Sequence, residues 1–308
     1  MLNLVFAAVL CSNVTAPFTG TICTPNDGKK RAAMVLLGGS EGGNSMGGAA
    51  STFARHGYVA ASVAYFGLPG LPKTLVSVPV ETVKHAIDAL RARPDVDASR
   101  LGILGISKGG EFALLAASTY PQIKAVVAIV PSPYAFMGLT QAGTGGCSWS
   151  KNGKDLPCIP ADSAAGMRVG MAMSQGQPVA FKPFYDASRA ADAAATKAAT
   201  FPMERINGPV LCLDGEDDQM WNSRAQCDGA IRYLRAHHHR YADREINYPN
   251  AGHTFIMATH GRKSALIQES GGGMTFLFGG TPQGDVAAAT ASWKAIWAFL
   301  RASLGLQR

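Results

Sequence analysis

The sequence is poor in charged residues, which make up only 16% of its 308 residues, while hydrophobic residues make up 47%. Low charge combined with abundant apolar residues excludes an intrinsically disordered protein. The sequence contains no internal repeat and no low-complexity tract. A chain of this length has enough apolar material for one large core, and a single α/β domain can reach this size.

The sequence also lacks the motifs of several binding classes. It has no CxxC pair, no cysteine–histidine spacing typical of zinc sites and no RNA- or DNA-binding motif. The net charge of +7 comes from scattered Lys and Arg, and the densest run, Lys29-Lys30-Arg31, lies in a turn before the first strong strand. We therefore expect a small-molecule substrate, no nucleic-acid partner, no metal and no cofactor.

No apolar run is long enough to span a membrane. The run from Leu2 to Leu10 is too short, and no Lys or Arg precedes it as in a signal peptide. Residues 1–31 therefore fit either a signal-derived segment or an edge strand of the folded domain.

The six cysteines leave the compartment open, because the chain could be cytoplasmic or exported. Cys147 and Cys158 flank a polar loop and are candidates for a disulfide in an oxidising compartment. Cys212 lies in an apolar strand and Cys227 in a helix, where ordinary buried thiols are common. The sequence does not indicate an oligomeric state.

Apolar runs alternate with helical patterns along most of the chain. Such runs, separated by helices, indicate a mostly parallel, doubly wound α/β sheet. We expect strands at residues 33–37, 58–64, 101–104, 123–130, 209–213 and 245–248, and helices at 46–56, 77–92, from 107 onwards, 221–238 and 286–304.

The alternation stops between Pro131 and Pro209, where Gly, Ala, Pro and Met are frequent and periodicity is weak. This stretch is too long for a simple loop. We therefore expect a helical lid insertion at about residues 134–205, within one domain that covers residues 32–308.

The pentapeptide Gly105-Ile106-Ser107-Lys108-Gly109 has the G-x-S-x-G pattern. The pattern alone is common, but here it joins a predicted strand to a predicted helix. That context is the nucleophile turn of an α/β-hydrolase, which exposes the serine hydroxyl above the sheet. We therefore predict that Ser107 is a nucleophile. The alternative is a helix-capping serine in a glycine-rich turn.

A serine nucleophile needs a base and an acid that orients the base. In this fold they follow in the order Ser, Asp, His, each just past the end of a strand. We assign Asp218 as the acid, with Asp217 as the near alternative, while Asp214 ends the preceding strand. We assign His253 as the base, which would deprotonate Ser107 and then protonate the leaving group.

Two backbone N–H groups should form the oxyanion hole. One is that of Lys108, directly after the nucleophile. The other should come from the glycine-rich loop at residues 38–43, where Ser40 is the first choice and Glu41 the second. This loop lacks the Lys-Ser/Thr ending of a P-loop.

These residues resemble one family. The segments at residues 104–111, 206–221 and 248–253 look like the nucleophile, acid and histidine segments of the acyl-CoA thioesterase / bile acid-CoA:amino acid N-acyltransferase C-terminal domain. The resemblance covers roughly residues 32–304 and places Ser107, Asp218 and His253 at the family's triad positions. It implies a dienelactone hydrolase-like α/β-hydrolase fold. Animal members carry an N-terminal β-sandwich domain, which we expect to be absent here.

The resemblance implies hydrolysis of acyl thioesters. The member that conjugates bile acids uses Cys, so Ser107 favours water as the acceptor. Carboxylic ester hydrolysis of the dienelactone hydrolase-like type is the alternative. A non-catalytic binding protein on a hydrolase scaffold is an alternative of another class. The segment at residues 134–205 shows no close match and is expected to shape the acyl pocket.

Overall fold

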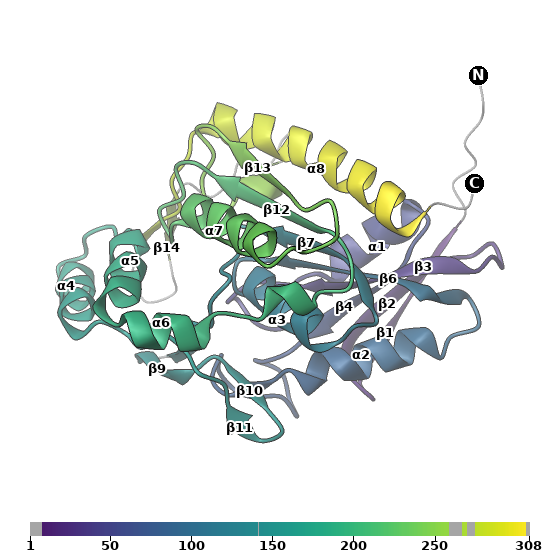
Figure 1. Ribbon diagram of the computed structural model, residues 1–308, viewed down its shortest axis with the longest axis horizontal. Coiled ribbons are helices and arrows are strands. Elements are labelled where there is room, and N and C mark those ends of the chain that lie inside the picture. The colour runs from purple at the N-terminus through teal and green to yellow at the C-terminus, as the bar shows by residue number, and fades with distance from the viewer. Residues whose placement is uncertain (1–7, 141, 259–266, 270–274, 306–308) are drawn as a thin grey trace.

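A computed structural model describes residues 8–140, 142–258, 267–269 and 275–305. Its centre is an eight-stranded sheet with the order β1-β2-β4-β3-β6-β7-β12-β13 (Figure 1). The six strands from β4 to β13 pair in parallel, whereas β1 and β2 pair antiparallel at one edge. The strands are β1 (Val9–Val14), β2 (Thr19–Pro25), β3 (Arg31–Leu37), β4 (Val59–Ala64), β6 (Val96–Ile106), β7 (Ile123–Ile129), β12 (Val210–Gly215) and β13 (Arg244–Tyr248).

Helices cover both faces of the sheet. Because side chains alternate along a strand, β3 supplies both cores: Val35 and Leu37 pack with one set of helices, and Met34 and Leu36 with the other. This confirms the predicted doubly wound sheet. The first set comprises α2 (Glu81–Arg91), α3 (Lys108–Thr119) and α7 (Ser223–Ala236), and the second α1 (Gly47–Arg55) and α8 (Pro282–Leu304). No described helix is both long and apolar enough to cross a membrane.

The N-terminal hairpin is part of the main sheet. β2 pairs along β4, and Cys11 in β1 lies opposite Cys23 in β2 and forms a disulfide with it. Of the apolar run from Leu2 to Leu10, residues 2–7 lie outside the described part of the chain.

The insertion between β7 and β12 is helical in its second part, as predicted, but it begins with strands that we did not predict. The turn Asn152-Gly153 has φ values of 52° and 72°, which is the left-handed pair that two-residue hairpins use. This Asn-Gly signal was available in the sequence. The elements are β8 (Met137–Thr140), β9 (Gly143–Cys147), β10 (Trp149–Lys151), β11 (Lys154–Asp155), α4 (Ser163–Ser174), α5 (Lys182–Ala191), α6 (Ala193–Ala199) and η1 (Met203–Arg205).

The remaining short elements lie beside this region. β5 (Val78–Pro79) pairs with β10, which links the insertion to the chain before α2. η2 (Phe255–Met257) follows the predicted base, and β14 (Ile267–Glu269) pairs with β15 (Thr275–Leu277).

All six cysteines are paired. The Cys147–Cys158 disulfide was predicted. The expectation of free thiols at Cys212 and Cys227 is wrong, because these residues form a disulfide. The reason is tertiary: α7 packs on β12, which brings the two Cα atoms to 5.7 Å, within the usual disulfide range.

We expect the native protein, denatured without reductant, to show no free thiol in a thiol-reactive dye assay and six after reduction. The double replacement Cys147→Ser/Cys158→Ser should lower the free energy of unfolding by about 3 kcal/mol in urea titrations. The reason is that this disulfide joins residues 11 positions apart and so restrains a loop in the unfolded chain. Two or more free thiols before reduction would contradict the pairing.

Candidate active site

Ser107 occupies a sharp turn between β6 and α3. Its φ of 57° lies in the left-handed region, which is rare for a residue with a Cβ atom. Its neighbours must be glycines: a Cβ on Gly105 would lie 1.9 Å from the Gly109 carbonyl oxygen, and one on Gly109 would lie 2.0 Å from the Gly38 carbonyl oxygen. The turn therefore depends on backbone packing that only glycine permits.

The structure brings Ser107, His253 and Asp218 into one hydrogen-bonded chain. His253 Nε2 lies 2.8 Å from Ser107 Oγ, and His253 Nδ1 lies 2.8 Å from Asp218 Oδ2. Both His253 and Asp218 are buried. This geometry suits a neutral imidazole that donates from Nδ1 to the carboxylate and accepts the serine hydroxyl at Nε2.

The second carboxylate oxygen fixes Asp218 in place. Asp218 Oδ1 accepts the backbone N–H groups of Met220 and Trp221, at 2.9 and 3.2 Å. The Trp221 indole N–H donates to the Val130 carbonyl oxygen at 3.0 Å, and its ring meets the ring of His253 edge-on, with centroids 5.8 Å apart. The carboxylate and the imidazole are thus held by the same loop.

The other two carboxylates considered from the sequence do not contact His253. Asp217 accepts from the Gln219 side chain and from the Gly280 backbone N–H. Asp214 is fully buried at the end of β12 and accepts from the Asn247 side chain at 2.6 Å. Both carboxylates thus have structural partners instead.

The expected oxyanion donors lie beside Ser107. Tyr65 donates its hydroxyl to the Gly39 carbonyl oxygen at 2.7 Å. Because the peptide is trans, the Ser40 N–H points the opposite way, away from Tyr65. Within the described residues, neither this N–H nor that of Lys108 has an acceptor. A Cβ on Gly39 would lie 3.4 Å from the Cβ of Ser107, so the two segments are adjacent.

Glu41, the second choice for this donor, contributes its side chain to the loop. Its Oε1 accepts the Gly39 backbone N–H at 3.0 Å. The sequence did not indicate this contact.

Sequence reasoning also missed a buried ion pair at the start of α3, between Lys108 and Glu111. Burial lowers the pKa of Lys108 and raises the pKa of Glu111, because both charges lose water. Across the described part of the chain, no cluster of three or more His, Cys, Asp or Glu side chains could hold a metal ion.

The model of the BAAT / acyl-CoA thioester hydrolase C-terminal family matches residues 78–306. The chain belongs to this family. One relative, human acyl-coenzyme A thioesterase 1, is 28% identical over 290 residues, which cover 93% of this chain and 63% of the relative. The chain therefore spans less than two thirds of that relative's length.

Solved structures give the fold. A dienelactone hydrolase-like promiscuous phosphotriesterase from metagenomic libraries aligns with a TM-score of 0.57 at 16% identity, covering 97% of this chain and 100% of that one. An α/β-hydrolase from Penicillium aligns with a TM-score of 0.54 at 11% identity, covering 97% and 99%. The chain thus has the α/β-hydrolase fold.

Asp214 should make stability depend on pH. Burial raises the pKa of Asp214 to about 7, against about 3.9 in an unfolded chain. Between these two pH values, folding is accompanied by the uptake of a proton at Asp214. The contribution of Asp214 to the free energy of unfolding is therefore complete below about pH 4 and is lost as the pH rises through about 7. We expect Asp214→Asn to remove the loss and to gain roughly 4 kcal/mol at most over wild type at pH 8. Urea titrations at pH 5 and pH 8 measure this; equal pH dependence in both proteins would contradict it.

Proposed function

We propose that the protein is a serine hydrolase that cleaves acyl thioesters through an acyl-enzyme intermediate. The observation that carries the proposal is the hydrogen-bonded chain Ser107–His253–Asp218. It lies beside the backbone N–H groups of Lys108 and Ser40, which have no acceptor among the residues that the structure describes. Membership of a family with acyl-CoA thioester hydrolase in its name supports this chemistry.

In the proposed mechanism, His253 Nε2 accepts the proton of Ser107 Oγ as the oxygen attacks the acyl carbonyl carbon. The N–H groups of Lys108 and Ser40 bind the resulting oxyanion. The carbon–sulfur bond then breaks, and His253 returns its proton to the leaving thiolate. Water, deprotonated by His253, then attacks the carbonyl carbon of the acyl-enzyme. The bond between that carbon and Ser107 Oγ breaks as His253 gives the proton to the serine oxygen, which releases the carboxylic acid and restores Ser107. Asp218 holds the imidazole in the required tautomer and stabilises its charged form.

The thioester preference rests on the relatives, since human acyl-coenzyme A thioesterase 1 shares 28% identity with this chain. The same three residues would also cleave oxygen esters, and the dienelactone hydrolase-like structural neighbour favours that second candidate. We further infer that residues 32–308, together with the N-terminal hairpin that pairs with β4, act as one domain whose insertion at 134–205 shapes the acyl pocket. Three disulfides support an oxidising compartment for the protein.

A fluorophosphonate probe should label the wild type and spare Ser107→Ala, because the probe reacts with activated serine hydroxyls. Equal labelling of both proteins would overturn the assignment of Ser107 as the nucleophile. In parallel, thiol release from an acyl-CoA series and cleavage of p-nitrophenyl esters should be measured on the same preparation. Turnover of CoA esters is expected; simple-ester cleavage with inert CoA esters would replace the thioesterase proposal by the esterase one.

Asp218→Ala should lower kcat by about 10³- to 10⁴-fold, because the imidazole loses its orienting partner. The matched control is Asp217→Ala, one residue away, which contacts Gln219 and Gly280 but not the imidazole. It should retain kcat within a few-fold. The reverse ranking of the two variants would transfer the orienting role to Asp217.

A further inference from the structure

The ion pair between Lys108 and Glu111 lies in an unfavourable place. Their side chains are 2% and 0% exposed, and the charged atoms are 3.1 Å apart. Burying two charges costs free energy that their attraction offsets only with good geometry. The lysine also lies in the first turn of α3, where the helix dipole disfavours a positive charge. A contribution to stability alone is therefore a weak explanation for the presence of this buried pair.

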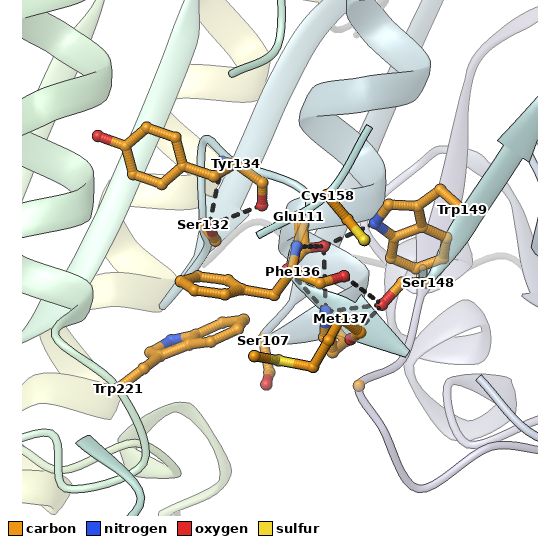
Figure 2. Close-up of polar contacts among 12 residues, drawn as sticks. Ser107, Glu111, Ser132, Tyr134, Phe136, Met137, Ser148, Trp149, Cys158 and Trp221 are labelled. Atoms are coloured by element: carbon orange, nitrogen blue, oxygen red, sulfur yellow. Dashed lines mark hydrogen bonds and ion pairs between the residues drawn. The ribbon is translucent and has the colours of Figure 1, made fainter. Parts of the chain in front are cut away.

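The pair joins α3 to the start of the insertion, and Figure 2 shows the contacts of Glu111 with Phe136 and Trp149. Glu111 Oε1 accepts the Trp149 indole N–H at 2.6 Å and the Phe136 backbone N–H at 3.1 Å. Lys108 Nζ donates to Ser148 Oγ at 2.9 Å. The two charges thus provide directed contacts to residues 25 to 40 positions further along the chain.

The same insertion segment reaches the histidine side of the site. The Phe136 ring stacks near the Trp221 ring, with centroids 6.1 Å apart (Figure 2). The Trp221 ring in turn meets the His253 ring edge-on. Ser148 Oγ lies within hydrogen-bond distance of the carbonyl oxygens of Phe136 and Met137. One short segment therefore contacts the helix that follows the nucleophile and the loop that holds the base.

We propose that the Lys108–Glu111 pair is a positioning device that fixes the first turn of α3, and with it the Lys108 backbone N–H, against the insertion. This inference rests on the proposed function of Ser107 as the nucleophile. The two side chains do not contact the reacting atoms, and they act through the placement of an oxyanion donor and of the adjoining pocket wall. Losing this placement should weaken transition-state binding more than substrate binding.

The test replaces both charges by apolar side chains of similar volume, as Lys108→Met/Glu111→Leu. Replacing the pair as a unit avoids leaving one charge buried and unpaired. It also leaves the Trp149 indole N–H and the Phe136 backbone N–H without their acceptor, so the thermal midpoint should fall, and kcat is measured at a temperature at which both proteins are folded. We expect kcat for p-nitrophenyl esters to fall by about 10- to 100-fold, as for a misplaced oxyanion donor, with KM changed by less than about threefold. The matched control is the exposed pair on α2, Lys84→Met/Asp88→Leu, which should leave kcat unchanged.

A trifluoromethyl ketone inhibitor provides a second measurement that a purely structural role would not change. Its hemiketal oxygen uses the same N–H donors as the transition state, so its affinity should weaken by the same factor as kcat/KM. A folded double variant with kcat within twofold of wild type would overturn the inference. So would a loss of kcat without any loss of inhibitor affinity.

Should the double variant fail to fold, Ser148→Ala/Trp149→Phe removes the two side-chain contacts that the insertion makes to the pair, keeps the Phe136 backbone N–H on Glu111 and leaves both charges in place. The phenyl ring can retain the stacking on Phe112, where the ring centroids are 4.2 Å apart. We expect kcat to fall by roughly 3- to 10-fold with KM unchanged, and an unchanged kcat would overturn the inference. Ser107→Ala keeps the two proposals distinct: activity in that variant would end the proposed function, whereas an inactive Ser107→Ala beside a fully active double variant would end only the positioning role.

Discussion

The arrangement of the site depends on close backbone contacts around Ser107. Gly105 and Gly109 have no Cβ atom, so β6 and α3 approach each other more closely than any other residues would allow. Gly109 approaches the Gly38 carbonyl oxygen for the same reason. That second contact holds the loop after β3 against the nucleophile turn, so the close backbone contacts bring both expected oxyanion donors next to Ser107. A positive φ at a non-glycine residue costs of order 1–3 kcal/mol and persists only where the surrounding structure enforces it. Here the central strands of the sheet do so.

A close backbone contact at a glycine also positions the turn that carries the proposed base, His253. A Cβ on Gly252, directly before His253, would lie 2.1 Å from the Gly279 carbonyl oxygen. His253 also donates its backbone N–H to the Phe278 carbonyl oxygen at 2.8 Å. The chain before α8 therefore supports the turn that carries the imidazole. Close glycine contacts thus position the backbone of both Ser107 and His253, and the Asp218 carboxylate and the Trp221 ring then orient the imidazole.

Much of this was predictable because the relevant signals are local. The central strands are continuous apolar runs, and in a parallel sheet their carboxyl ends share one edge, so residues just past Leu104, Leu213 and Tyr248 had to lie near each other. The choice of Asp218 over Asp217 and Asp214 could not follow from that rule, since Asp214 lies at the end of β12 and the other two follow it within four residues. The hydrogen bond to His253 separates them, and it depends on side-chain directions that the sequence pattern does not specify.

What the sequence could not indicate depends on contacts between distant residues. Lys108 and Glu111 are three positions apart in a helix, which is the spacing of an ordinary exposed pair. Here the pair is buried by tertiary packing, to which Phe136, Ser148 and Trp149 contribute contacts. Apolar packing is non-directional, whereas each hydrogen bond to these charges specifies an angle as well as a distance. The disulfide at Cys147, the residue before Ser148, restrains the strand that supplies these partners. The Cys147–Cys158 disulfide and the Lys108–Glu111 pair are therefore suited to hold the loop-rich insertion in one position against α3. An apolar interface of the same size would define that position less precisely.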